Sequence, residues 1–265
     1  MLLKTQNLSI SFGGLKAINQ VDFELEANEI RGFIGPNGSG KSTFFNLVSG
    51  IYDSDEGSYI EFDGVDITRK QQHEIASLGL SRTFQLLRLY QEMTVLDNVM
   101  SGYHMRVPYS FVEAVIGRKK IWDQEKIIKE EMMDLLDFVG LADYAELNAN
   151  ELSGGQRRLL VLARAIAMQP KLLMLDEPAA GLSPHNVDNL MKIIMQLKNK
   201  YNLTLIIIEH ILKVVMDTCS KITVLDYGKK IAEGAPAAIQ YDDAVIEAYL
   251  GKKMNDEEIK AELKA

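Results

Sequence analysis

Two groups of residues with chemically useful side chains lie far apart in this chain. The first is the glycine-rich run Gly35-Pro36-Asn37-Gly38-Ser39-Gly40-Lys41-Ser42-Thr43, and the second is the acidic pair Asp176-Glu177 at the end of an apolar run. Glycines let a backbone curl so that successive N–H groups point at an anion. Carboxylates at a strand end can face a metal ion and polarise water. Together the two groups indicate a site that binds a phosphate compound and hydrolyses it.

The glycine-rich run matches the P-loop pattern, with a glycine, four residues, and then Gly40-Lys41-Ser42. The chemistry requires a strand before the loop and a helix after it. The apolar run Ile30 to Ile34 predicts that strand, and Lys41 to Val48 predicts that helix. Lys41 would neutralise the β- and γ-phosphates, and the Ser42 hydroxyl would bind Mg²⁺. Kinases, GTPases and motor ATPases share this element, so alone it predicts only nucleoside triphosphate binding.

The acidic pair predicts two separate roles. Asp176 ends the strand expected over Leu172 to Leu175, where a carboxylate faces the Mg²⁺ region beside a phosphate loop. Glu177 is the next residue, so its side chain points in a different direction from that of Asp176. This direction suits a group that polarises the attacking water.

A third element, Ser153-Gly154-Gly155-Gln156, precedes a predicted helix that contains Leu160 and Arg164. Serine at a helix start is an ordinary N-cap. The same N–H groups and hydroxyl would also make a second anion site. The residues alone leave both interpretations open.

Composition and charge limit the partners. Hydrophobic residues make up 47% of 265, enough for a substantial core, and the net charge is −8. An acidic balance argues against a broad nucleic-acid-binding surface. The single cysteine, Cys219, excludes an internal disulfide framework and is expected to be a small buried side chain.

No segment reads as a membrane anchor. The N-terminus has no apolar core of signal-peptide length, and runs such as Leu205 to Ile208 are far shorter than the ~20 residues that span a bilayer. The sequence therefore predicts a cytoplasmic chain that works at a membrane only through a partner.

The two ends of the chain show the sequence pattern of an α/β structure, and the middle shows a helical pattern. Leu203 to Ile208 predicts a second strand covered on both faces, and residues 221–232 predict a hairpin turning at Tyr227-Gly228. From residue 93 to 167 the pattern is mostly helical, with one helix stopped by Gly140. Another expected helix shows an apolar stripe, which consists of Val187, Leu190, Ile193, Ile194 and Leu197.

The order of these motifs resembles that of ABC ATPases. Their signature is similar to residues 153–156, and the resemblance covers nearly the whole chain. It implies a P-loop NTPase core with a mixed sheet and helices, an N-terminal antiparallel β part, and an inserted α-helical subdomain at about residues 86–162. Residues 1–250 would form a single ABC ATPase domain, and residues 251–265 a charged tail.

By this resemblance Gln85 looks like the family's Q-loop glutamine, which contacts Mg²⁺ and water. His210 looks like the switch histidine that reaches the γ-phosphate, and Phe12 stands where the family stacks an aromatic ring on adenine. Residues 181–184 look like the D-loop, with Pro184 in place of the commoner Asp. The implied catalytic residues are Glu177, His210, Gln85 and Lys41. The implied Mg²⁺ ligands are Ser42, Gln85 and Asp176. The implied ATP-binding residues are Phe12, Gly35, Pro36, Asn37, Gly38, Ser39, Gly40, Lys41, Ser42, Thr43, Ser153, Gly154, Gly155 and Gln156.

Several local stretches resemble the ATPases of branched-chain amino acid importers. They are residues 11–17, 82–85, 92–99, 176–182 and 247–251, together with an extra stretch that includes Pro108 to Lys120. The resemblance implies ATP-driven uptake of hydrophobic amino acids through a separate permease. The alternatives are the ATPase of a urea or amide importer, of a lipid or lipopolysaccharide exporter, and less readily an ABC ATPase outside transport or a cassette without catalysis.

The same resemblance implies the partners. Two subunits, identical or similar, would close head to tail across ATP, because the signature of one completes the ATP site of the other. The chain would lie peripherally on the cytoplasmic face of the membrane, bound to permease subunits and indirectly served by a substrate-binding protein. The apolar side chains between Gln85 and Met105 are expected to divide between a core and a groove that receives a permease helix.

Overall fold

The computed structural model describes residues 1–83, 88–103 and 118–250, with side chains omitted at 118–124 and 250. The chain divides into two compact units. The first combines Met1–Ile75 with the part of the chain from Thr204 onward, and the second is Ala76–Leu203.

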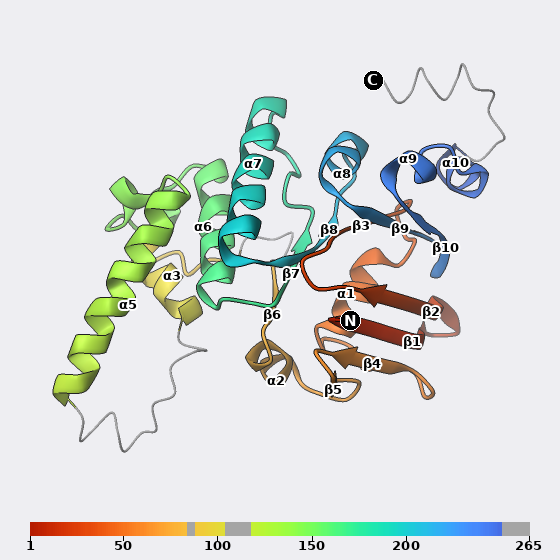
Figure 1. Ribbon diagram of the computed structural model, residues 1–265, viewed down its shortest axis with the longest axis horizontal. Coiled ribbons are helices and arrows are strands. Elements are labelled where there is room, and N and C mark those ends of the chain that lie inside the picture. The colour runs from red at the N-terminus through yellow and green to blue at the C-terminus, as the bar shows by residue number, and fades with distance from the viewer. Residues whose placement is uncertain (84–87, 104–117, 251–265) are drawn as a thin grey trace. The chain divides into compact units, whose positions relative to one another are not determined.

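The first unit begins with a four-stranded sheet in the order β2-β1-β4-β5 (Figure 1). β1 runs antiparallel to both β2 and β4, and β4 runs antiparallel to β5. This confirms the antiparallel N-terminal part. The strands are β1 Leu3–Phe12, β2 Leu15–Leu25, β4 Tyr59–Phe62 and β5 Val65–Asp66.

A second group of strands in this unit surrounds β3 Ile30–Ile34. β3 pairs in parallel with β8 Thr204–Ile208 on one side and with β9 Lys221–Asp226 on the other. β9 continues through a turn into the antiparallel β10 Lys229–Gly234, which confirms the predicted hairpin. All residues of β3 and β8 are buried, as expected for strands covered on two faces.

The helices of the first unit pack around these strands. α1 rests on the sheet through aromatic rings, with Phe44 stacked on Phe33 of β3 at 4.6 Å between ring centroids. The helices of this unit are α1 Lys41–Val48, α8 Leu212–Thr218, α9 Pro236–Ile239 and α10 Asp243–Leu250, and α2 Gln72–Ser77 crosses the division between the units.

The second unit is mainly helical, as the sequence predicts, and has one parallel strand pair, β6 Leu80–Arg82 with β7 Leu172–Asp176. α3, α5 and α6 lie side by side (Figure 1). The described helices of this unit are α3 Val95–Tyr103, α5 Arg118–Phe138, α6 Gly154–Ala167 and α7 Pro184–Tyr201, with short 3-10 turns at Ala142–Tyr144 and Ala149–Glu151. The inserted subdomain at about 86–162 stays a prediction.

The predicted stripe on α7 differs at one position. Four of its five members are buried, whereas Ile193 is only half-buried and Met191 is buried beside them. The core-facing strip of a helix is broader than a single line of residues. Gly140 follows α5 with a φ of 74°, which confirms its role as a helix stop. Cys219 is buried as predicted, and this burial raises the pKa of its thiol to about 12.

One buried cation ties the strands of the first unit together. Arg31 on β3 is 1% exposed and contacts Glu29 at 2.6 Å and Glu233 at 3.3 Å. It also donates to the hydroxyl of Thr223 and lies over the ring of Phe23. A buried guanidinium is tolerated only with such partners.

We therefore expect Arg31→Met to lower the free energy of unfolding by about 3 kcal/mol, because it removes the cation paired with the largely buried Glu29 carboxylate, whereas Glu233 keeps Lys221 and Lys230. Urea denaturation would measure the loss. The matched control is Lys4→Met, since Lys4 makes only a loose surface pair with Glu24 at 3.8 Å and should cost less than about 1 kcal/mol. Equal losses in the two variants would contradict this account of Arg31.

Candidate functional site: a phosphate loop and an acidic strand end

The phosphate loop connects β3 to α1, as the sequence predicts. Gly35, Gly38 and Gly40 have φ values of 150°, 79° and 105°, a region that other residues rarely adopt. α1 begins at Lys41 with no side chain capping its first turn and no acidic residue in that turn. The first N–H groups of α1 and the positive end of its dipole therefore favour an anion.

Lys41 and Ser39 supply further groups for an anion. Lys41 is 6% exposed, and its Nζ donates to the carbonyl oxygens of Gly35 at 2.7 Å and Pro36 at 3.0 Å. Ser39 is buried, and its hydroxyl has no hydrogen-bond partner among the described residues. A buried unsatisfied hydroxyl beside a buried ammonium fits a phosphate-binding loop. Ser42 and Thr43 lie in the first turn of α1, with Ser42 exposed.

The first glycine of the loop has no room for a side chain. A Cβ on Gly35 would collide with the carbonyl oxygen of Leu225 and lie 2.6 Å from the Ser39 hydroxyl oxygen. The loop starts where β3 leaves the sheet, so this close approach to β9 sets its direction.

His210 follows β8 by two residues. Since β3 and β8 are parallel neighbours, with Phe33 opposite Ile208, the chain leaves both strands at the same edge of the sheet. His210 is exposed, and its backbone N–H donates to the carboxylate of the buried Glu209 at 3.2 Å. The structure thus brings His210 and Gly35 to one sheet edge.

Phe12 ends β1 with its ring 46% exposed. Tyr52 packs edge-on against it, with 5.3 Å between the ring centroids. An exposed aromatic ring held by a second ring presents a surface suited to stacking on a planar base.

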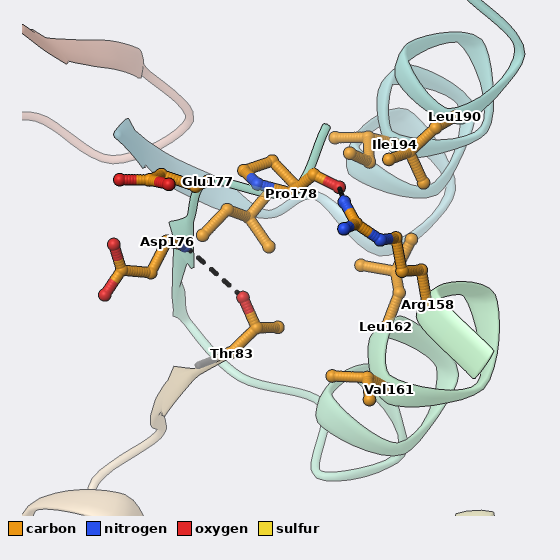
Figure 2. Close-up of a pocket in the computed structure, with 10 residues that line it drawn as sticks. Thr83, Arg158, Val161, Leu162, Asp176, Glu177, Pro178, Leu190 and Ile194 are labelled. Atoms are coloured by element: carbon orange, nitrogen blue, oxygen red, sulfur yellow. Dashed lines mark hydrogen bonds between the residues drawn. The ribbon is translucent and has the colours of Figure 1, made fainter. Parts of the chain in front are cut away.

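Asp176 and Glu177 stand at the end of β7 in the second unit. Both carboxylates extend away from the apolar side chains of a small pocket beneath them (Figure 2). The backbone N–H of Asp176 donates to the hydroxyl of Thr83 at 3.4 Å, and its carboxylate pairs with Arg82 at 2.8 Å. Arg82 and Asp176 are each only 7% exposed, so the pair holds an acid and its counter-ion out of water.

Glu177 has a φ of 49°, an unusual value for a residue other than glycine. Its carbonyl accepts from the N–H of Ala180, and Arg158 on α6 donates to the carbonyls of Pro178, at 2.6 Å, and Ala180 (Figure 2). These bonds hold the turn after Asp176, so the strained backbone is maintained by its surroundings. Strain of this kind concentrates at functional sites.

The signature residues begin α6. Ser153 and Gln156 form a reciprocal capping box, in which Ser153 N donates to Gln156 Oε1 at 2.9 Å and Gln156 N donates to Ser153 Oγ at 3.4 Å. The N-cap interpretation is therefore confirmed. A Cβ on Gly154 or Gly155 would meet nothing within 4 Å. Packing among the residues that the structure describes therefore gives no reason for glycine at these two positions.

A larger cavity of about 470 Å³ lies next to the small pocket beneath Asp176 and Glu177 in the second unit and shares Thr83 and Val161 with it. Leu89, Val161 and Met168 give it an apolar wall, and Arg88 and Arg164 line it with charge. Arg164 lies over the ring of Tyr90 at 5.7 Å from the centroid, and burial lowers the pKa of its guanidinium.

The predicted apolar segment 85–105 divides as expected among its described members. Leu89, Leu96 and Val99 are buried, whereas Tyr90 and Met93 are 56% and 38% exposed. Gln85 and its neighbours Leu86 and Leu87 lie outside the described residues, as do most of the extra stretch 108–120 and the tail 251–265.

Sequence reasoning missed several residues that hold the site. It did not predict the pairing of Arg82 with Asp176, the bonds of Arg158, or the packing of Tyr52 on Phe12. Arg82 ends a strand parallel to β7, but no spacing pattern gives its partner, since the two residues are 94 positions apart.

Comparison with known families agrees with this geometry. The model of the ABC transporter family matches residues 18–180, more than half of the chain. The chain therefore belongs to the ABC transporter family, as one of its ATP-binding cassettes, which are the ATPases of such transporters. A second model, described as the branched-chain amino acid ATP-binding cassette transporter, matches residues 229–253.

Individual relatives extend over nearly the full length. The chain is 38% identical over 251 residues to the high-affinity branched-chain amino acid transport ATP-binding protein BraF of Pseudomonas aeruginosa, covering 95% of this chain and 98% of BraF. It is 42% identical over 254 residues to a probable branched-chain amino acid transport ATP-binding protein, LivG, of Archaeoglobus fulgidus, covering 94% and 95%. The ADP conformation of MJ1267, an ATP-binding cassette of an ABC transporter, superposes with a TM-score of 0.81 at 34% identity, covering 95% of this chain and 99% of that one.

No helix among the described residues is long and apolar enough to cross a membrane.

The geometry at Gly35 gives a direct prediction. Gly35→Ala should lower the free energy of unfolding by about 1–3 kcal/mol, because the added methyl group must displace Leu225 or the loop. It should also weaken ATP binding at least about tenfold, since the displaced loop no longer presents its N–H groups. Thermal unfolding and nucleotide titration would measure the two effects. Gly234→Ala is the control, because its Cβ would make only ordinary contacts of 3.6 Å or more. Wild-type affinity in Gly35→Ala would contradict the assignment.

Proposed function

We propose that this chain is the ATP-hydrolysing subunit of an importer for branched-chain amino acids. The observation that carries the proposal is the match of residues 229–253 to the cassette type of these transporters, which lies outside the general ATPase region. Near full-length similarity to BraF and LivG supports the same substrate class. The urea, lipid and non-transport alternatives have no such support.

In the proposed mechanism, Phe12 stacks on adenine while the N–H groups and Lys41 of residues 35–43 hold the phosphates. Ser42, Asp176 and Gln85 would hold Mg²⁺, which supplies charge neutralisation at the phosphates. Magnesium sites of this kind use one or two protein oxygens together with phosphate oxygens. The hydroxyl of Ser42 and the carboxylate of Asp176 are donors of that type.

Glu177 and His210 carry the proposed chemistry. Glu177 takes a proton from, or orients, the attacking water, and His210 holds the γ-phosphate. The strained backbone at Glu177, held by the Arg158 bonds, supports an assignment in which the carboxylate must be positioned before the reaction.

We also propose that a second copy, or a similar subunit, completes the site through its residues 153–156. The open space around Gly154 and Gly155 supports this arrangement, since it leaves room for a ligand to approach the α6 N-terminus closely. A two-fold arrangement would place the same signature on each of two equivalent ATP molecules.

The membrane partner is proposed to dock in the 470 Å³ cavity of the second unit. Its apolar wall, its three arginines (Arg82, Arg88 and Arg164) and the exposed Tyr90 suit a short permease helix with an apolar face and an acidic side chain. This docking would bring the chain to the cytoplasmic face of the membrane.

The experiment that tests the catalytic proposal is Glu177→Gln. It should lower the ATPase rate by about 10²- to 10⁴-fold, the usual contribution of a positioned acid–base group, while ATP binding remains. An ATP-bound dimer should then accumulate, whereas Lys41→Ala should weaken binding itself. Steady-state kinetics and size-exclusion chromatography would follow these effects. Asp188→Asn, at an exposed acid on α7, is the control. A normal rate in Glu177→Gln would refute the role of Glu177.

The docking proposal has its own test. Tyr90→Glu, at the cavity, and Met93→Glu, at an exposed apolar residue three positions further along the same segment, should greatly reduce co-purification of the permease from detergent-solubilised membranes, because a charge would enter an apolar contact. ATP binding by the isolated subunit should not change. Ile127→Glu, at a 63% exposed apolar residue on α5, is the matched control. Unchanged co-purification of the permease with both groove variants would defeat the docking assignment.

A further inference from the structure

The C-terminal helix of the chain reaches the phosphate loop. Tyr249, near the end of α10, accepts a hydrogen bond at its hydroxyl oxygen from the backbone N–H of Gly35, at 2.8 Å. The two residues are 214 positions apart in the sequence. The first amide of the phosphate loop is therefore held by a side chain from the opposite end of the described chain.

This amide lies just beyond the strand pairing. The pairing of β3 with β9 ends with Ile34 opposite Val224, and the pairing with β8 ends one residue earlier, at Phe33. Gly35 is buried, so its N–H needs a partner within the protein. The Tyr249 hydroxyl provides that partner at the residue where the chain turns from strand into loop.

A second hydrogen bond, from the C-terminal part of the chain, holds the middle of the loop. The N–H of Gly228, in the turn between β9 and β10, donates to the carbonyl of Ser39 at 2.9 Å. A Cβ on Gly228 would lie 2.7 Å from the carbonyl oxygen of Ala17 on β2, so only glycine allows this turn to lie so close to β2. Gly228 and Tyr249 thus fix the loop at two points, Ser39 and Gly35.

We propose that Tyr249 is a positioning residue for ATP binding, which sets the direction of the phosphate loop through its bond to Gly35. The inference rests on the proposed role of residues 35–43 in holding the phosphates. It gives the C-terminal segment matched by the branched-chain cassette model a part in the nucleotide site. Tyr249 as a whole is 37% exposed, but desolvation raises the pKa of its hydroxyl to about 12, so the acceptor stays neutral throughout the physiological pH range.

A purely structural role would be different. If Tyr249 only anchored α10, removal of its hydroxyl would loosen that helix and leave the affinity for ATP unchanged. If Tyr249 positions the loop, removal of its hydroxyl leaves the Gly35 N–H without a partner, and the loop then samples other conformations. Half-saturation by ATP would then require more nucleotide, whereas the maximal rate would change less.

The test is Tyr249→Phe in the full chain, which keeps the ring and removes only the hydroxyl. We expect the KM for ATP and the Kd of a fluorescent ATP analogue to rise about three- to tenfold, the range given by loss of one hydrogen bond. The kcat should stay within about twofold. Tyr241→Phe, at a 66% exposed ring with no bond to the loop, should change neither constant. An unchanged KM and Kd in Tyr249→Phe, with or without a lower unfolding temperature, would overturn the inference.

A measurement on the wild-type protein does not depend on how the variant folds. Hydrogen exchange of the Gly35 amide should be slow before any nucleotide is added, and a fast exchange there would contradict the bond. Failure of the proposed function and failure of the role of Tyr249 give different results. Wild-type protein that binds no ATP would refute the proposed function, whereas normal ATP binding with an indifferent Tyr249→Phe refutes only the role of Tyr249.

Discussion

The close approach of Gly35 to Leu225 is the constraint on which the proposed nucleotide site depends. β3 is hydrogen-bonded to β8 and β9 along its length, so the point where the chain leaves the sheet is fixed. Any side chain at Gly35 would meet the backbone of β9, and the loop curls only because none is present. From that point the curl delivers Lys41 to the loop interior and starts α1 with uncapped N–H groups. The positive end of the site is thus produced mainly by backbone geometry, with a single charged side chain added to it.

The second unit contributes negative charge instead, and its buried carboxylate is paired with a cation. Asp176 is buried against Arg82, and the strained turn after it is held by Arg158 through backbone carbonyls. An unpaired carboxylate in such surroundings would cost several kcal/mol. The chain therefore carries the proposed phosphate-binding loop on one unit and a supported acidic strand end on the other. The open start of α6 at Gly154 and Gly155 has no explanation in the packing of the described part of the chain, and it is the reason for the proposed second subunit.

Local structure could be predicted from the sequence wherever the residues of a motif determine their own backbone conformation. The strand, loop and helix of residues 30–48, the Ser153 cap and the hairpin at Tyr227-Gly228 all follow from neighbouring residues, and the structure confirms them. The supporting contacts were not predictable, because their partners lie far away in sequence. Tyr249 meets Gly35, and Arg82 meets Asp176, only after the strands have been placed in register. Ile193 shows a smaller limit of prediction from the sequence. Helical periodicity predicts which face of a helix is buried but not how wide that face is.

The central claim is that each chain holds an incomplete hydrolytic site and that a second subunit completes it. The most direct measurement is the ATPase rate per chain as a function of protein concentration, with the mass in solution followed by light scattering under the same conditions. The account predicts that the rate per chain rises with concentration, in parallel with the fraction of dimer. A rate per chain that stays constant down to concentrations where every particle is a monomer would contradict it.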